Sequence, residues 1–206
     1  MFITNPQIEE YLKSLPKEKD PILEEMENLG HKLNFPIVDK LVGRFLYLIT
    51  KLKNPQLIVE VGSGFGYSAY WFAKALNKGK VVLTEYREEN INLAKKFFER
   101  GNLIDKADFR LGDGIEIASE YKNIDILFLD LEKRRYKEAI EKLLPNLSSN
   151  ALIIADNVLW HGKVVEEEID NQTKAIKEFN EFMFSLPNFF SVMIPLRDGV
   201  LVSLKE

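Results

Sequence analysis

The chain is 206 residues long, which is enough for one well-packed core. Its hydrophobic fraction of 46% and charged fraction of 29% are ordinary for a globular protein, and a formal net charge of -4 excludes an overall basic field that would attract nucleic acid or membrane. The absence of cysteine excludes disulfide scaffolds, thiolate metal sites and cysteine nucleophiles. The first residues lack a signal-peptide pattern, and no apolar run reaches the roughly 18–20 residues that a membrane span needs, so we expect a cytoplasmic protein without a membrane partner.

Residues 1–53 are predicted to form a helical extension packed on a single domain that spans residues 1–206. Asp20 followed by Pro21 is typical of a helix start, because the carboxylate caps the first turn and proline has its φ already set. Asp39 can cap the next helix in the same way. The expected apolar face of that second helix is Leu41, Phe45, Leu48, Ile49 and Leu52.

From residue 57 onward, short apolar runs alternate with amphipathic helices. The predicted strands cover 57–61, 81–84, 107–111, 124–129 and 151–155, and the predicted helices cover 68–77, 88–100, 135–144 and 173–186. The runs are interpreted as uninterrupted apolar strands that are covered on both faces. This alternation predicts an α/β fold with a doubly wound, Rossmann-like sheet. Two last runs, 189–196 and 200–204, are joined by a short turn and predict an antiparallel pair at the end of the sheet.

A glycine-rich segment, Gly62-Ser63-Gly64-Phe65-Gly66, lies between the first predicted strand and a helix, where glycines allow a sharp turn and a close ligand. The dinucleotide fingerprint would place its third glycine where Tyr67 stands, one residue after Gly66. Glu60, just before the turn, disfavours a pyrophosphate and suits a ligand with an ammonium group and a sulfonium. These two details favour S-adenosylmethionine over a dinucleotide, with a simple tight turn as the alternative.

Two further positions are candidates for the same cofactor. Glu85 ends the second predicted strand about 20 residues after the loop, the distance at which a carboxylate reaches the ribose hydroxyls. Asp113 and Gly114 follow the third strand and can close over an adenine. Ordinary surface turns are the alternative interpretation of both positions.

Polar side chains stand where the fourth and fifth predicted strands end: Asp130 after one, Asp156 and Asn157 after the other. Open α/β sheets bind ligands at this edge, and hard oxygen donors suit Mg²⁺, Ca²⁺ or Mn²⁺ rather than Zn²⁺. Lys133 is a candidate general base, because a nearby cation would lower its pKa while the metal acidifies a bound hydroxyl. Each residue alone would be interpreted as a cap or turn residue, but their joint occurrence favours catalysis.

These motifs resemble the cation-dependent O-methyltransferases, the family of catechol and caffeoyl-CoA O-methyltransferases and their bacterial relatives. The stretches that carry the resemblance are 60–68, 129–133, 156–160 and 195–199. The resemblance implies a seven-stranded sheet with an antiparallel last strand, a homodimer, and catalysis by Lys133 and Asp130. It implies metal binding by Asp130, Asp156 and Asn157. It implies S-adenosylmethionine binding by Val38, Gly62, Ser68, Glu85, Asp113, Gly114 and Asp130, beside the Glu60 predicted above. Leu131 and Glu132 replace the Ala-Asp that many relatives carry.

Three features of the sequence bear on the acceptor. Trp160 and His161 are candidate walls for a hydroxylated aromatic small molecule, whereas His31 is expected to have no catalytic role. The basic run at 133–137 is either a solvated helix start or a site for phosphates of a coenzyme A ester or RNA. Some bacterial relatives methylate 5-hydroxyuridine at the tRNA wobble position, and residues 34–37 are similar to theirs, so tRNA is the alternative acceptor. A nicotinamide-dependent oxidoreductase and a non-catalytic binding protein are the competing classes.

Overall fold

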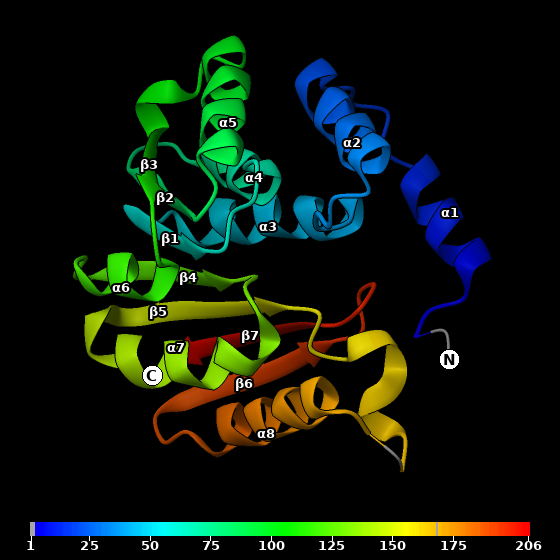
Figure 1. Ribbon diagram of the computed structural model, residues 1–206, viewed down its shortest axis with the longest axis vertical. Helices are drawn as coiled ribbons and strands as arrows, with labels where there is room; N and C mark the ends of the chain where they lie inside the picture. The colour runs from blue at the N-terminus through cyan, green and yellow to red at the C-terminus, as the bar shows by residue number, and fades with distance from the viewer. Residues whose placement is uncertain (1–2, 168) are drawn as a thin grey trace.

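The structure, a computed structural model, describes residues 3–167 and 169–206 and contains the predicted seven-stranded sheet (Figure 1). Its strands are β1 (Leu57–Val61), β2 (Lys80–Glu85), β3 (Ala107–Leu111), β4 (Ile124–Leu129), β5 (Leu147–Asp156), β6 (Phe189–Ile194) and β7 (Val200–Lys205). Their order is β3-β2-β1-β4-β5-β7-β6, and the first five pair in parallel. Strand β7 is antiparallel to both β5 and β6, so the sequence-based prediction of an antiparallel last strand is confirmed.

Helices cover both faces of the sheet. They are α1 (Pro6–Ser14), α2 (Pro21–Leu33), α3 (Lys40–Lys53), α4 (Tyr67–Ala75), α5 (Glu88–Arg100), α6 (Gly114–Ser119), α7 (Tyr136–Leu143) and α8 (Asn171–Ser185). Short 3₁₀ segments lie at Ile104–Lys106, Lys133–Arg135, Leu144–Asn146 and Trp160–Val165. Helices α3, α4 and α5 pack into one apolar cluster and α6, α7 and α8 into another, on opposite sides of the sheet. The two clusters together form the core. None of the helices in the described ranges is long and apolar enough to cross a membrane.

The central strands are buried on both faces, as predicted, but β3 is not. Strands β1 and β4 are almost wholly buried, which agrees with uninterrupted apolar runs. Strand β3 lies at the edge of the sheet, and none of its residues is fully buried. The expectation of two-sided burial is therefore wrong for β3, because Asp108 and Arg110 interrupt its apolar pattern and an edge strand tolerates them.

The N-terminal helices begin where the sequence predicts, but α3 buries a different face. Asp20 accepts hydrogen bonds from the first backbone N–H groups of α2, and Asp39 accepts one from α3 at 2.9 Å. The predicted apolar face of α3 is partly wrong, since Leu48 and Leu52 are 56% and 73% exposed. The helix instead turns Gly43 toward α4, because only glycine lets the backbone rest against the Trp71 indole.

Two helices and one strand start were not predicted individually. Helix α1 lies within the predicted helical extension of residues 1–53; it has no buried residue and begins at an Asn5 cap followed by proline. Helix α6 is only six residues long, which is too short for a visible apolar period. Strand β5 begins at Leu147 rather than at 151, because the polar stretch 148–150 precedes its buried part.

Candidate active site at the carboxyl edge of the sheet

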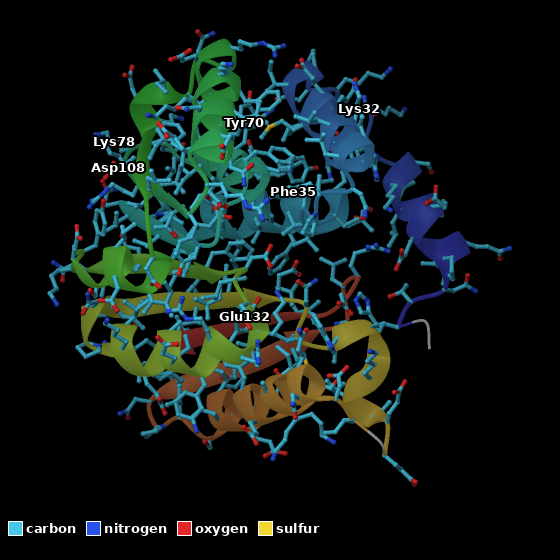
Figure 2. The ribbon with its side chains drawn as sticks, viewed as in Figure 1. Lys32, Phe35, Tyr70, Lys78, Asp108 and Glu132 are labelled. Atoms are coloured by element: carbon cyan, nitrogen blue, oxygen red, sulfur yellow. The ribbon has the colours of Figure 1, made fainter. Side chains whose placement is uncertain are left out.

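The glycine loop after β1 brings two strand ends close together. Gly62, Gly64 and Gly66 all have φ between 51° and 91°, the left-handed region that favours glycine. A Cβ at Gly62 would lie 2.5 Å from the backbone oxygen of Asp130, so glycine here allows the loop to approach the end of β4. Phe35, labelled in Figure 2, fills the space beside Gly64 and reaches the loop from the N-terminal region.

Glu60 is a fully buried carboxyl group at this loop. Ser68 donates a hydrogen bond to its Oε1, whereas Oε2 has no partner among the described residues. Burial raises the pKa of Glu60 to about 8, with Ser68 opposing the shift and the charge of Asp130 adding to it. A buried carboxylate oxygen without a partner is costly unless a ligand supplies a donor. The arrangement therefore fits a ligand with N–H groups, such as the ammonium group of S-adenosylmethionine.

Glu85 and Asp113 stand at the ends of β2 and β3, as predicted, but their surroundings differ. Glu85 is half-buried and accepts a hydrogen bond from the backbone of Arg87 at 2.9 Å. Asp113 caps α6 and accepts from Arg135 at 2.8 Å and from the Tyr86 hydroxyl at 2.6 Å. Burial raises the pKa of Asp113, but these hydrogen bonds outweigh burial and hold it well below its ordinary value. The Asp113 carboxylate is thus already engaged within the chain.

A cavity of 720 Å³ adjoins the edge of the sheet. Val38, 4% exposed, lines it from the segment before α3. Asp156 and Asn157 line it from the end of β5, and Pro6 and Glu9 line it from α1. The predicted metal residues of β5 and the N-terminal region therefore face one space. Its size lies within the range of small-molecule sites.

Asp130, Lys133 and Asp156 lie together at the ends of β4 and β5. The Lys133 side chain is 9% exposed, and its ammonium group is 3.0 Å from Asp130 Oδ1. Asp156 is buried, and its Oδ1 has no partner among the described residues. Burial raises the pKa of Asp156, Asp130 raises it further, and Lys133 opposes the shift. This edge of the sheet thus holds two carboxyl groups, Asp130 and Asp156, beside one lysine.

This set of donors fits a hard divalent cation. Asn157 follows Asp156 directly, has φ of +59° and is half-buried. Asp130, Asp156 and Asn157 together offer two carboxylates and an amide, the oxygen ligands that Mg²⁺, Ca²⁺ and Mn²⁺ accept. In residues 3–167 and 169–206 no group of three or more histidine, cysteine or acidic side chains is arranged to hold a metal. A site here would therefore depend on the amide as well as the carboxylates.

The turn between β6 and β7 holds the loop that follows Asn157, and the sequence did not reveal this. Asp198 Oδ1 accepts a hydrogen bond from the backbone N–H of His161, and the Asp198 carbonyl accepts from Leu159 at 2.9 Å. Gly199 has φ of +85°, and its hydrogen atoms face Leu159 where a Cβ would clash. The two segments are 37 residues apart in sequence, so only the fold shows this contact.

Tyr136, which the sequence-based interpretation placed within a basic run, is part of the site. Its side chain is fully buried, and its oxygen accepts a hydrogen bond from Lys133 Nζ at 2.6 Å. Burial lowers the pKa of Lys133, but Tyr136 and Asp130 outweigh burial and hold it above its ordinary value. The residues by themselves do not lower the pKa of Lys133, so the lowering expected for a base would require a bound cation.

The basic residues after Lys133 are ion-paired within the chain. Arg134 contacts Glu132, labelled in Figure 2, at 2.8 Å, and Arg135 contacts Glu138 at 3.0 Å besides Asp113. These pairs agree better with a solvated helix start than with a phosphate site.

Of the proposed acceptor walls, the structure places only His161 at the cavity. His161 lines the cavity with a side chain that is 72% exposed, and its ring centroid lies 5.5 Å from that of Trp160. Trp160 is half-buried in the apolar cluster under α8. His31, on α2, is exposed and also lines the cavity.

The sheet is doubly wound with an antiparallel β7. It carries a glycine loop after β1 and acidic groups at the ends of β4 and β5. This combination defines the class of Rossmann-like methyltransferases. The family model described as O-methyltransferase matches residues 13–206. The chain therefore belongs to the O-methyltransferase family, which leaves no support for a nicotinamide-dependent oxidoreductase.

Individual relatives agree with this assignment. The chain is 28% identical over 200 residues to caffeoyl-CoA O-methyltransferase 1 of Eucalyptus globulus, covering 90% of this chain and 81% of the relative. It is 31% identical over 148 residues to a catechol O-methyltransferase of Niastella koreensis, covering 68% and 67% of the two chains. The crystal structure of the O-methyltransferase from Bacillus cereus in complex with SAH is similar with a TM-score of 0.87, 26% identity and 97% of each chain covered.

Proposed function

We propose that this S-adenosylmethionine-dependent O-methyltransferase methylates a hydroxyl of a small catechol-like aromatic acceptor, with a divalent cation and with Lys133 as general base. The observation that carries the proposal is the convergence at one sheet edge of Lys133, 3.0 Å from Asp130, and of the buried Asp156, which lines the 720 Å³ cavity. Relatives named for catechol and caffeoyl-CoA support an aromatic acceptor.

The residues of the glycine loop hold the cofactor in this proposal. S-adenosylmethionine supplies a methyl group on a sulfonium. Glu60 presents an unpartnered oxygen for the cofactor's ammonium group, and Ser68 holds the other oxygen of that carboxyl group. Gly62 allows the cofactor to approach the backbone, and Glu85 at the end of β2 binds the ribose hydroxyls. Val38, Asp113, Gly114 and Asp130 complete the proposed contacts.

The cation would be held by Asp130, Asp156 and Asn157, with Mg²⁺ as the first candidate and Ca²⁺ or Mn²⁺ as alternatives. Such a cation supplies Lewis acidity to the acceptor hydroxyl and disfavours the charged form of Lys133. Lys133 then accepts the hydroxyl proton at Nζ. Much of the acceleration comes from holding the acceptor oxygen in line with the methyl group, for which no covalent enzyme intermediate is needed.

A small acceptor is supported by the charges around the site. Arg134 and Arg135 are paired with Glu132, Asp113 and Glu138, so the basic run has its charges engaged. A tRNA wobble 5-hydroxyuridine would use the same reacting groups and is the alternative acceptor. That alternative requires phosphate contacts which would have to displace these internal ion pairs.

Two further proposals concern the architecture. We propose that residues 1–53 form an extension of one domain and cover the cofactor, in accord with Val38 lining the cavity. We also propose a homodimer, because the face of β6 and β7 opposite α8 carries the exposed side chains Phe190, Val192 and Leu204. An apolar sheet face of this kind is a common interaction surface.

Removal of divalent cations tests the metal in this function. Exhaustive chelation with EDTA should abolish methyl transfer to a catechol, and added Mg²⁺ should restore it, while calorimetric binding of S-adenosylmethionine changes much less. The binding measurement is the control, because Asp130 is the only residue proposed for both the cofactor and the metal. Full turnover after chelation would remove the cation from the proposal.

A further inference from the structure

The Tyr136 hydroxyl lies between the ends of the two strands that carry the acidic residues. Its oxygen is 3.1 Å from the carbonyl oxygen of Leu129 in β4 and 3.0 Å from that of Asp156 in β5. It is also 2.6 Å from Lys133 Nζ. One buried hydroxyl thus joins both strand ends to the proposed base.

Counting donors fixes the direction of these hydrogen bonds. A phenol has one O–H to donate, and beside a charged Lys133, which has no lone pair, only the Leu129 and Asp156 carbonyls can accept it. The Lys133 amine must therefore donate to Tyr136. A second N–H of Lys133 donates to Asp130 at 3.0 Å. Two of the three N–H positions of the lysine are then committed, and the third has no partner among the described residues.

We propose that Tyr136 is a positioning residue that orients Lys133 so that its remaining position faces the acceptor hydroxyl. A neutral lysine has two N–H donors and one lone pair, and Tyr136 and Asp130 engage both donors. The lone pair is left to take the acceptor's proton: the acceptor O–H bond breaks and an N–H bond forms on Lys133. Tyr136 keeps its own proton throughout. This inference rests on the proposed role of Lys133.

The hydroxyl can be tested apart from the ring. The Tyr136 ring packs edge-on against Phe179 with centroids 5.1 Å apart, and Lys133 Nζ lies 4.7 Å from the ring centroid. Phenylalanine at 136 would keep both ring contacts and remove only the hydroxyl. Tyr121→Phe is a matched control, because that hydroxyl donates to Asp108 at 2.5 Å and accepts from Arg110, away from the proposed base.

The test is a double-mutant cycle on turnover with Tyr136→Phe, Lys133→Ala and the double variant. Tyr136→Phe should lower kcat about 10- to 100-fold, part of the roughly 10²- to 10⁴-fold that a positioned acid–base group contributes. The acceptor KM and the calorimetric Kd of S-adenosylmethionine should stay nearly constant, as they should in the Tyr121→Phe control. The double variant, measured in long single-turnover reactions, should be no slower than Lys133→Ala.

The outcomes separate this inference from the proposed function. Wild-type turnover in Lys133→Ala would overturn both. Low turnover in Lys133→Ala with wild-type kcat in Tyr136→Phe would overturn the positioning role alone. If the kcat losses of the two single variants multiply in the double variant, Tyr136 does not act through Lys133 and is a structural residue. The same conclusion follows if Tyr136→Phe loses cofactor affinity and melting temperature as strongly as it loses kcat.

Discussion

At the scale of single residues, the unusual feature of the site is a buried carboxyl group that the chain only half satisfies. Glu60 has one oxygen bonded to Ser68 and one without a partner among the described residues. Its pKa of about 8 lies above the ordinary value of 4.5, so the folded protein holds this proton more tightly than the unfolded chain does. The stability of the cofactor-free protein should therefore fall as pH rises through this window.

Glu60→Gln should remove that loss of stability. Between about pH 4.5 and 8 the wild type should lose up to about 1.4 kcal/mol of unfolding free energy per pH unit relative to the variant, since glutamine has no proton to lose. Chemical unfolding of both cofactor-free proteins at pH 5 and pH 8 measures the difference, with the exposed Glu99→Gln as control. The variant should also bind S-adenosylmethionine more weakly. If the unfolding free energies of the wild type and the variant change in parallel with pH, burial does not raise the pKa of Glu60.

The sequence predicted the site residues that follow strands, but not the residues whose partners lie far away in sequence. Asp130, Lys133 and Asp156 could be predicted together, because parallel strands end at one edge of the sheet. Tyr136 and Asp198 could not, because their partners depend on how β4 and β5 align and on where the β6–β7 turn falls. The engagement of Asp113 by Arg135 also appears only in three dimensions.

At the scale of elements, the face of β6 and β7 opposite α8 leaves three apolar side chains exposed: Phe190, Val192 and Leu204. Phe190 pairs with Leu204 in register, and Val192 lies on the same face two residues along β6. Helix α8 packs on the opposite face of this pair. The alternation of exposed and partly buried residues along β6 is the pattern of a strand with one open face.

A double substitution on this face should weaken the proposed homodimer. Burial of each apolar side chain contributes roughly 1.5–3 kcal/mol, so Phe190→Ser with Val192→Ser should raise the dimer dissociation constant by about 100-fold or more. Sedimentation of the wild type should give twice the mass of one chain, and the variant should approach one. Phe184→Ser, exposed on α8, is the control. A monomeric wild type would contradict the proposal.

The helices and strands could be predicted where the apolar period is strong. The faces that they bury could not be predicted where tertiary contacts determine them. The alternation of apolar runs and helices predicted the first five strands, and the short turn between two apolar runs predicted the last two. The face that α3 buries depended on Gly43, which carries no apolar signal, and the open side of β3 depended on strand order. Propensity and period describe an element alone, whereas these two features depend on its neighbours.

At the scale of the whole molecule, the charges favour a small acceptor over a nucleic acid. The net charge is -4, and two arginines near the site have internal partners. Arg135 pairs with Asp113, and Arg197 at the cavity pairs with Asp39 at 3.2 Å. Affinity for RNA depends on cations that are free to contact phosphates. A neutral catechol needs no such contact.

The most direct measurement is transfer of a labelled methyl group from S-adenosylmethionine in the presence of Mg²⁺, run in parallel on a simple catechol and on tRNA that lacks the wobble modification. We expect efficient, Mg²⁺-dependent transfer to the catechol and only background transfer to the tRNA. Efficient transfer to the tRNA, with the catechol methylated only slowly, would contradict it and would make RNA the acceptor of the same site.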